Sequence, residues 1–487
     1  MKKIFIALLV FLAGLTDPAS AQLVYKDVAG IFYSRCTNCH RPNGGAPFSM
    51  LTYSETAPWA SLIQNAVQTG KMPPWLPDTT YTRFLHERII TAAEKNAILS
   101  WVGSGAQAGD TTQAPPPPIY TSQYKLKGTP DLIIKIPAFP SNGNSTDAYN
   151  CFSIPTGLTQ DRWVRAFEIV PNNPALVHHV VVKVDSTGTV ASNTSGNCFS
   201  QPGDFDLDVW AVGGQPTVFP GQTPLKTGIR LKAGSNINLQ VHYPPGTAGQ
   251  IDSTQMRIYL YPAGATGIRP IYVSTPLQNW NMFILANTTP TYSAQYPSSG
   301  GLPAALSIFG TFPHSHLLCK TMENYADQGA TKIPLIKINN WDFEWQGFYT
   351  FPNLVKIPAG YTLRSAHMYD NTANNPNNPN SPPQLVTAGE GTTDEMLFDS
   401  FQWLYYLPGD ENIDIGGLLA SDTLWNNPVT SVSETGHFYA TASFVYPNPF
   451  NTTASVFAPG FDFSAQKPVL KIFDIFGSEV HSQVLGS

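Results

Sequence analysis

Hydrophobic and polar positions follow two different periods along the chain. Residues 62–67 and 91–102 place apolar side chains at helical spacing and predict helices. After four prolines at 115–118 the period changes to two, and short apolar runs separated by Gly, Pro and Asn clusters predict strands. The expected strands are residues 132–136, 177–182, 237–241, 256–261 and 335–338.

This change of period predicts how the chain divides. A polyproline run is stiff, extended and unable to join a sheet, so it marks a boundary. The β-patterned part, about 300 residues long, is too long for one sandwich. We therefore expect a multidomain, mostly β protein, with a break near 262–265. The expected parts are a small α-helical domain (22–109), a Pro-rich linker (110–124), two antiparallel β-sandwiches (125–264 and 265–432) and a C-terminal β segment (433–487).

The first residues predict export. Lys2 and Lys3 precede an apolar stretch, Ile4–Leu15, and Ala19-Ser20-Ala21 follows as a cleavage site. The stretch is shorter than the roughly 20 apolar residues of a membrane-spanning helix, so residues 1–21 read as a secretory signal peptide. A retained N-terminal anchor is the alternative. No later segment is apolar for long enough to span a membrane. The mature chain is expected to be secreted or at the cell surface, where thiols oxidise.

Composition excludes several classes of protein. Of 487 residues only 12% are charged, against a typical value of about 25%, while 43 Pro and 38 Gly supply turns. This argues against a coiled coil, a helical repeat array or a charged disordered chain. The net charge of −6 without a basic run argues against nucleic acid as a partner.

One motif in the helical segment predicts a haem. Cys36-Thr37-Asn38-Cys39-His40 fits C-x-x-C-H, in which the thiols of Cys36 and Cys39 attach a c-type haem and His40 binds its iron. We expect Met72, between Lys71 and two prolines, to be the sixth ligand, with Met50 as the alternative. A small disulfide loop is the other reading of the cysteines. The domain resembles a small cytochrome c, which implies electron transfer.

Five histidines of the β region fall in three places. His314 and His316 are two apart, so on a strand both rings face one side. His178 and His179 are adjacent, so joint ligation requires a bulge, a strand end or different ring nitrogens. His242 alternates with apolar residues and therefore lies on a polar face, away from the core. Each alone is a weak signal. The histidines without partners at ligand spacing are expected to be structural: His86, His367, His437 and His481.

Taken together, these motifs resemble a known family. Leu176-Val177-His178-His179, Leu239-Gln240-Val241-His242-Tyr243, His314-Ser315-His316 and Thr393-Asp394-Glu395-Met396 stand in the order and approximate spacing of the type II copper, ascorbate-dependent monooxygenases, which include the peptidylglycine α-hydroxylating and dopamine β-monooxygenases. An Asn-rich segment, 369–379, is also similar. The resemblance covers roughly residues 125–430.

The resemblance implies two jelly-roll sandwiches and two copper ions. One copper would be bound by His178, His179 and His242, and the other by His314, His316 and Met396. Thioether sulfur favours Cu(I) and imidazole suits both oxidation states, so the Met396 site is the expected oxygen-activating centre and the all-His site the electron store. Packing of Met396 in a core is the alternative. The resemblance also implies a Cys151–Cys198 disulfide and leaves Cys319 as a buried spectator or, alternatively, a copper ligand.

Departures from the family bear on the substrate and on the electron source. Phe312, Phe398 and Ser400 stand where the peptide-hydroxylating members hold a substrate carboxylate. We therefore expect a small apolar or aromatic substrate besides O2, and charged residues lining that pocket would count against it. The fused haem, supplied by an external electron donor, is expected to relay electrons to the all-His copper.

Competing readings remain for function and for the C-terminal segment. A non-catalytic electron-transfer or copper-binding protein, or a surface adhesion module, could be built on the same two β-sandwiches. Residues 446–451 and 469–477 resemble the opening of the sorting domain recognised by the type IX secretion machinery of Bacteroidota, here a partial β-sandwich. An ordinary pair of terminal strands is the alternative.

Overall fold

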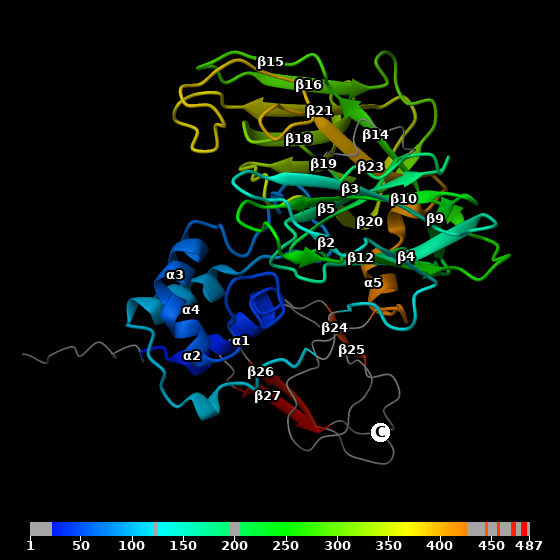
Figure 1. Ribbon diagram of the computed structural model, residues 1–487. Coiled ribbons are helices and arrows are strands. Elements are labelled where there is room, and N and C mark those ends of the chain that lie inside the picture. The colour runs from blue at the N-terminus through cyan, green and yellow to red at the C-terminus, as the bar shows by residue number, and fades with distance from the viewer. Residues whose placement is uncertain are drawn as a thin grey trace, which may run out of the picture. The chain divides into compact units, whose positions relative to one another are not determined.

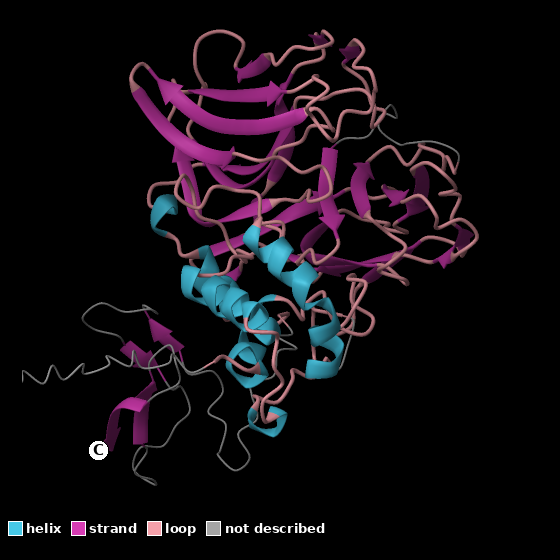
Figure 2. Ribbon diagram, turned by 90° about the vertical axis from the view of Figure 1, so that its left-hand side faces the viewer, coloured by secondary structure: helices cyan, strands magenta, loops and turns pink. Residues whose placement is uncertain are grey.

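The computed structural model describes residues 22–120, 124–194 and 205–425, together with four strands between 444 and 484. Antiparallel strands dominate, and helices are few, as the sequence predicts (Figure 1, Figure 2). The chain divides into two compact units at residues 430 and 431. The predicted signal peptide, residues 1–21, lies outside the described residues. Within the described ranges, no helix has the length and apolar character needed to cross a membrane.

Helices gather in the N-terminal segment, drawn in blue in Figure 1. Its first helix, α1 (Tyr25–Arg35), packs on α4 (Ala92–Gly103), where Phe32 meets Trp101 edge-on with ring centroids 5.7 Å apart. The N-terminus of α4 is fixed by a capping box between Thr91 and Glu94. Both predicted helices are present, whereas the apolar pattern did not predict α1. The remaining elements are α2 (Tyr53–Thr56), α3 (Ala60–Gln68) and 3₁₀ turns at Ala57–Trp59 and Thr111–Gln113.

The first sandwich has a core between two sheets, and all the predicted strands here are present within three residues at each end. A four-stranded sheet runs in the order β3 (Ala148–Pro155), β10 (Asn236–Tyr243), β5 (His179–Asp185), β6 (Phe205–Ala211). The facing sheet runs β1 (Leu132–Lys135), β12 (Gln255–Leu260), β4 (Arg162–Val170), β9 (Leu225–Leu231), β13 (Arg269–Pro270), with β7 (Thr217–Val218) on β4 and β8 (Gly221–Gln222) on β9; β2 (Phe139–Pro140) pairs with β11 (Ile251–Asp252).

The second sandwich also has two sheets around a core. One runs β14 (Tyr272–Gln278), β23 (Phe398–Tyr405), β17 (Leu306–Phe312), β20 (Tyr349–Ile357), and the other β16 (Thr291–Tyr296), β21 (Thr362–Tyr369), β18 (Cys319–Gln328), β19 (Thr331–Ile338). Smaller elements are β15 (Phe283–Ile284), β22 (Val386–Thr387), a 3₁₀ turn (Asp410–Asn412) and α5 (Ile415–Ala420).

In the C-terminal unit the structure describes two antiparallel strand pairs. They are β24 (Phe444–Tyr446) with β25 (Ser455–Phe457) and β26 (Val469–Phe473) with β27 (Glu479–Val484). The other residues of the expected sorting segment lie outside the described ranges.

Strand alternation divides the four-stranded sheet of the first sandwich into two chemically different faces. Val180, Val182 and Val184 of β5 join the core, as do Ile237, Leu239 and Val241 of β10. Because side chains alternate along a strand, the residues between them face away from that core. Cross-strand pairs on this second face are His179 with His242, Val181 with Gln240, and Lys183 with Asn238.

One buried carboxyl group lies at the edge of this sheet. Asp208 of β6 is 6% exposed, and burial raises its pKa to about 7. The Thr217 hydroxyl donates a hydrogen bond to Asp208 Oδ2 at 3.4 Å, which is too long to offset the burial. Asp208 is therefore neutral in the folded protein at mildly acidic pH.

We expect Asp208→Asn to flatten the pH dependence of stability. The folded-state pKa of about 7 exceeds the unfolded value of roughly 3.9, so the folded state binds the extra proton between these values. The contribution of Asp208 to stability is complete below about pH 4 and is lost as the pH rises through 7. The thermal midpoint of the wild type should fall more between pH 5 and pH 8 than that of Asp208→Asn. Equal falls would contradict this prediction.

Candidate metal centres

Three imidazoles of the first sandwich converge on one point. The Nδ1 atom of His178 lies 3.1 Å from Nδ1 of His179 and 3.1 Å from Nδ1 of His242, and the last two are 3.3 Å apart. The centre of this triangle is about 1.8 Å from each nitrogen, slightly shorter than the roughly 2.0–2.1 Å of an imidazole–zinc bond. The three nitrogens are therefore spaced to bind a single metal ion.

Adjacent histidines reach this point because the first one precedes its strand. The strand β5 begins at His179, and His178 lies just before it, with its backbone N–H donating to the carbonyl of His242 at 3.0 Å. His178 is thus released from the alternation that would turn it to the opposite face. The sequence leaves open a bulge, a strand end or the use of different ring nitrogens. The structure shows the strand end, and all three histidines present Nδ1.

Neighbouring side chains orient His242. Its Nε2–H donates to Asp147 Oδ1 at 2.7 Å, which leaves the lone pair on Nδ1 for a metal. The Tyr149 ring stacks on the imidazole with centroids 4.4 Å apart. Burial, followed by the neighbouring His242, lowers the pKa of His178 to about 4 and that of His179 well below its ordinary value. Both rings are therefore neutral at pH 7, the form that binds metals.

The second group of donors lies in the second sandwich. His314 and His316 follow β17 on an extended segment that is not paired as a strand, yet both rings and Met396 line the same pocket. His314 Nδ1–H donates to Gln346 Oε1 at 2.7 Å, and His316 Nδ1–H donates to the carbonyl of Asp394 at 3.1 Å. Each ring therefore keeps its Nε2 lone pair. Burial lowers the pKa of His314 to about 3 and that of His316 to about 4.

One buried carboxyl group links the two segments of this group. Glu395 is fully buried, and its Oε2 accepts from the backbone N–H of His316 at 3.0 Å and of Met396 at 3.1 Å, while Oε1 accepts from Leu318 at 2.7 Å. Burial raises the pKa of Glu395 to about 8, against the lowering effect of these donors. Glu395 therefore fixes where a histidine and the methionine stand relative to each other.

The residue between the two histidines adds a second link. The Ser315 hydroxyl donates to the carbonyl of Met396 at 2.6 Å, and the Tyr369 hydroxyl donates to the same oxygen at 2.7 Å. His367, expected to be structural, is fully buried between Ser315 Oγ, 2.9 Å away, and Asp399 Oδ2, 3.1 Å away. Both the N–H and the carbonyl of Met396 are thus held, which fixes its backbone relative to Ser315 and His316.

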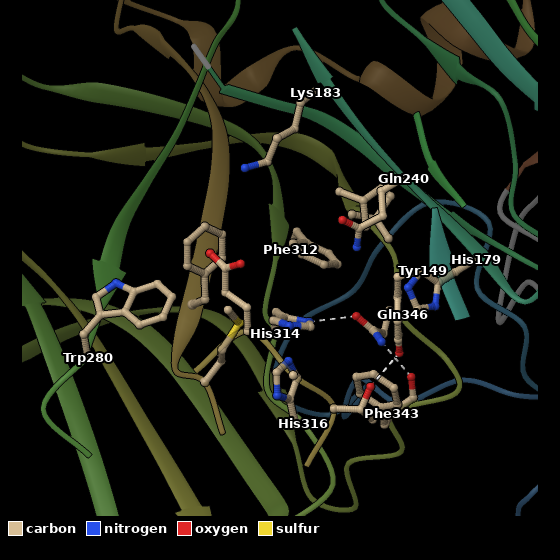
Figure 3. A pocket seen from close by; sticks show the side chains of 17 residues that line it. Tyr149, His179, Lys183, Gln240, Trp280, Phe312, His314, His316, Phe343 and Gln346 are labelled. Atoms are coloured by element: carbon tan, nitrogen blue, oxygen red, sulfur yellow. Dashed lines mark hydrogen bonds between the residues drawn. The ribbon is translucent and has the colours of Figure 1, made fainter. Parts of the chain in front are cut away.

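One pocket of about 850 Å³, its open mouth included, is lined by His179 of the first group and by all three donors of the second (Figure 3). The Phe343 ring lies between them, with its centroid 6.3 Å from that of His179 and 5.6 Å from that of His316. The aromatic residues Trp280, Phe312 and Phe398 line the same space. Charged residues line it as well, namely Lys183 and Glu390. By the criterion set from the sequence, this counts against a purely apolar substrate.

The C-x-x-C-H segment follows α1 directly, and its donors fit a covalent haem. The thiols of Cys36 and Cys39 are not paired in a disulfide, which excludes the disulfide-loop reading in the structure. His40 Nδ1–H donates to the carbonyl of Phe48 at 3.2 Å, which leaves the lone pair on Nε2 to bind a metal. Met50 is buried in the helical core, whereas Met72 is only half-buried.

The remaining cysteines and histidines have varied surroundings. Cys151 is disulfide-bonded, and its expected partner Cys198 lies outside the described residues. Cys319 is a buried thiol in the core of the second sandwich. The His86 ring stacks on Trp425 with centroids 5.2 Å apart. His437 and the side chain of His481 are outside the described part of the chain.

The sequence interpretation missed the residues that orient the donors. Asp147, Gln346 and Phe343 had no signal, because none stands at a regular spacing from a histidine. Glu395 stands in the Met396 motif, but the sequence assigns it no role of its own. The structure gives it one, since its two carboxyl oxygens accept hydrogen bonds from three backbone N–H groups on two segments.

Comparisons with known proteins add no family. No family model and no curated protein matches the chain. Among solved structures, the infectious bursal disease virus VP2 subviral particle aligns at 10% identity over 62% of this chain and 77% of that one, with a TM-score of 0.18. The T=1 particles derived from the same virus align at 10% identity over 62% and 74%, with a TM-score of 0.17.

The first cluster should bind copper independently of the second. We expect two coppers per wild-type chain and about one in His178→Ala, because the remaining two nitrogens hold the ion too weakly to survive dialysis. Elemental analysis after dialysis measures this. His86→Ala, which removes a histidine outside both clusters, is the control and should keep two coppers. Retention of both coppers in His178→Ala would contradict the assignment.

Replacement of the Glu395 carboxyl group should affect the second cluster selectively. In Glu395→Gln, the amide N–H₂ would face backbone N–H groups, which should lower the free energy of unfolding by about 1–3 kcal/mol. It should also loosen Met396, so a mild chelator would remove the second-site copper first. Thermal unfolding and copper counts after chelation measure these effects. Glu390→Gln, which changes a nearby carboxylate that lines the pocket, should leave both unchanged. Wild-type midpoint and copper retention in Glu395→Gln would refute the prediction.

Proposed function

We propose that this chain is a secreted monooxygenase that contains two coppers and one c-type haem and uses O2 to hydroxylate a C–H bond. The observation that carries the proposal is a pair of donor groups, one of three imidazoles and one of two imidazoles with a thioether. His179 of the first group lines the same pocket as all three donors of the second. Bound copper would supply dioxygen activation, and bound haem would supply one-electron transfer.

The donor types support different roles for the two groups. Three neutral imidazoles suit both copper oxidation states, as an electron-storing site requires. His314, His316 and Met396 form a softer set that favours Cu(I) and leaves a coordination position open. The aromatic walls beside Met396 would exclude water and hold the substrate near this site.

The reaction requires a supply of electrons. One oxygen atom of O2 enters the C–H bond, and the other leaves as water after two electrons and two protons are taken up. The haem-attachment loop approaches the first cluster closely enough to support this supply. A Cβ built on Gly213 would lie 2.7 Å from Sγ of Cys39. Two residues earlier, Ala211 pairs across the sheet with His179. An external donor would therefore reduce the haem, and this short path would lead to the all-His site.

The helical segment would act as a cytochrome c in this proposal. Met72 would be the sixth iron ligand, because Met50 is already buried in the apolar core. The signal peptide and the partial sorting segment would direct the chain through the type IX secretion machinery to the cell surface or the medium.

A non-catalytic electron-transfer or copper-binding protein is the second candidate. Both donor groups would serve such a protein equally well. The aromatic pocket beside Met396 favours the enzyme, because a carrier has no need to enclose an organic molecule. An adhesion module would need neither donor group.

Oxygen consumption by Met396→Ala tests the proposal. The full-length protein, loaded with copper and haem, should consume O2 only when both an electron donor and a substrate are present. Removal of the thioether should abolish at least nine-tenths of this rate while the first-site copper and the haem spectrum persist. Met322→Ala, a change in the core of the second sandwich away from the pocket, controls for lost packing. A metal count of haem iron alone, or a wild-type protein that turns over no substrate from an aliphatic and aromatic library, would refute the monooxygenase.

A further inference from the structure

A second cavity lies where three parts of the chain meet. With its open mouth included it measures about 920 Å³, within the range of about 300–1,000 Å³ that is usual for small-molecule sites. Its walls come from the end of the helical segment (between 75 and 88), from β6 and β7 of the first sandwich and from residues 346–350 of the second. Of the described residues, only Val209 and Gln346 line both this cavity and the pocket beside Met396.

One wall of this cavity carries a guanidinium group without a protein partner. Within the described part of the chain, Arg88 forms no hydrogen bond, ion pair or cation–π contact. Its Nη1 atom would lie 3.1 Å from a Cβ built on Gly213, so the guanidinium reaches from the helical segment to the first sandwich. Among the described lining residues the only carboxyl group is that of Asp208, and it forms no ion pair with Arg88. The charge of Arg88 is therefore not matched by a neighbouring side chain.

A second donor without an acceptor lines the same cavity. The Nε1 atom of Trp75 is buried and has no hydrogen-bond partner among the described residues. Native proteins leave few buried N–H groups unsatisfied, because such a group has lost its bonds to water. The Trp75 ring meets that of Tyr349 edge-on, with centroids 5.4 Å apart, so packing fixes the indole. The cavity thus combines a cation with a buried N–H donor, and neither has an acceptor from the protein.

The walls indicate the shape of a molecule that would satisfy these donors. Three tryptophan rings and a tyrosine ring line the cavity: Trp75, Trp210, Trp425 and Tyr349. Aromatic rings pack well against the faces and edges of other planar, conjugated groups. A guanidinium group binds a carboxylate through two parallel hydrogen bonds, which gives both strength and a defined direction.

From these observations we propose that this cavity binds a small organic anion with a planar, conjugated body, and that Arg88 binds its carboxylate. The Trp75 N–H donates to the same ligand, whose body lies among the tryptophan rings. The site is a second small-molecule site, beyond the pocket of the proposed monooxygenase reaction, and it requires no copper.

Calorimetric titration of the full-length, haem-loaded protein tests the proposal. The probes are 2-naphthoate, its neutral amide 2-naphthamide and inorganic phosphate. At pH 6 Asp208 is mostly protonated, since burial raises its pKa to about 7, and it does not compete with the probes for Arg88. We expect the acid to bind about tenfold more tightly than the amide at low ionic strength, and phosphate, which lacks an apolar body, to bind most weakly. The preference for the acid should shrink as salt is added.

Variants assign the binding to this cavity. The preference for the acid should disappear in Arg88→Met and persist in part in Arg88→Lys, which keeps the charge without the paired donors. Arg230→Met, on an exposed side chain of β9, controls for the loss of one positive charge, and Phe398→Leu changes the pocket beside Met396. Both should bind the acid as the wild type does. Thermal midpoints confirm that each variant is folded, and Arg88→Gln replaces Arg88→Met if the latter does not fold.

A nuclear magnetic resonance signal reports on the second donor. The indole N–H signal of Trp75, assigned by its absence in Trp75→Phe, should shift when 2-naphthoate is added and stay in place in Arg88→Met. A packing role for Trp75 alone would leave the signal unmoved.

Several results would overturn the proposal. They are equal binding of the acid and the amide, a preference that survives in Arg88→Met, phosphate binding as tight as that of the acid, an unmoved Trp75 signal, and weaker binding in Phe398→Leu. Binding to haem-free protein alone would show that the haem fills the cavity, and would also overturn it. If the protein binds no copper but still selects the acid through Arg88, the monooxygenase fails and this site stands.

Discussion

The alternation of side chains along β5 and β10 is the constraint on which the rest of this structure depends. One face of these strands must pack into the core of the first sandwich, so the other face is left for His179, Val181 and Lys183 and for their partners across the sheet. A shift in pairing by one residue would move His242 into the core and its apolar neighbours into the pocket. The register that stabilises the sandwich is therefore the register that brings the imidazoles together.

In the second sandwich, hydrogen bonds rather than strand register position the metal-binding side chains. His314 and His316 stand on a segment without strand pairing, where alternation alone does not fix their position. Glu395 and the Ser315 hydroxyl bind this segment to the backbone of Met396. The two donor groups thus differ in how they are supported as well as in their chemistry: one is held by a sheet, the other by a buried carboxyl group.

Much of the fold could be predicted from the sequence, because periodicity reports burial directly. The helices around 62–67 and 91–102 and all five strands in the β region followed from it, as did the polar face that carries His242. The loop at 341–348 could not be predicted, since Phe343 and Gln346 reach the site through tertiary packing between β19 and β20. Glu395 could not be interpreted either: a buried acid is unfavourable until its three backbone donors, two of them far away in sequence, are known.

The contact at Gly213 joins parts of the chain that the sequence divides at a proline run. Gly213 has a φ of +82°, and Sγ of Cys39 occupies the space where its side chain would begin. A larger residue at position 213 would push the segment that carries Cys39 away from the sandwich. The helical segment is therefore fitted to this particular sandwich, and an unrelated helical domain grafted in its place would meet a surface shaped for a different neighbour.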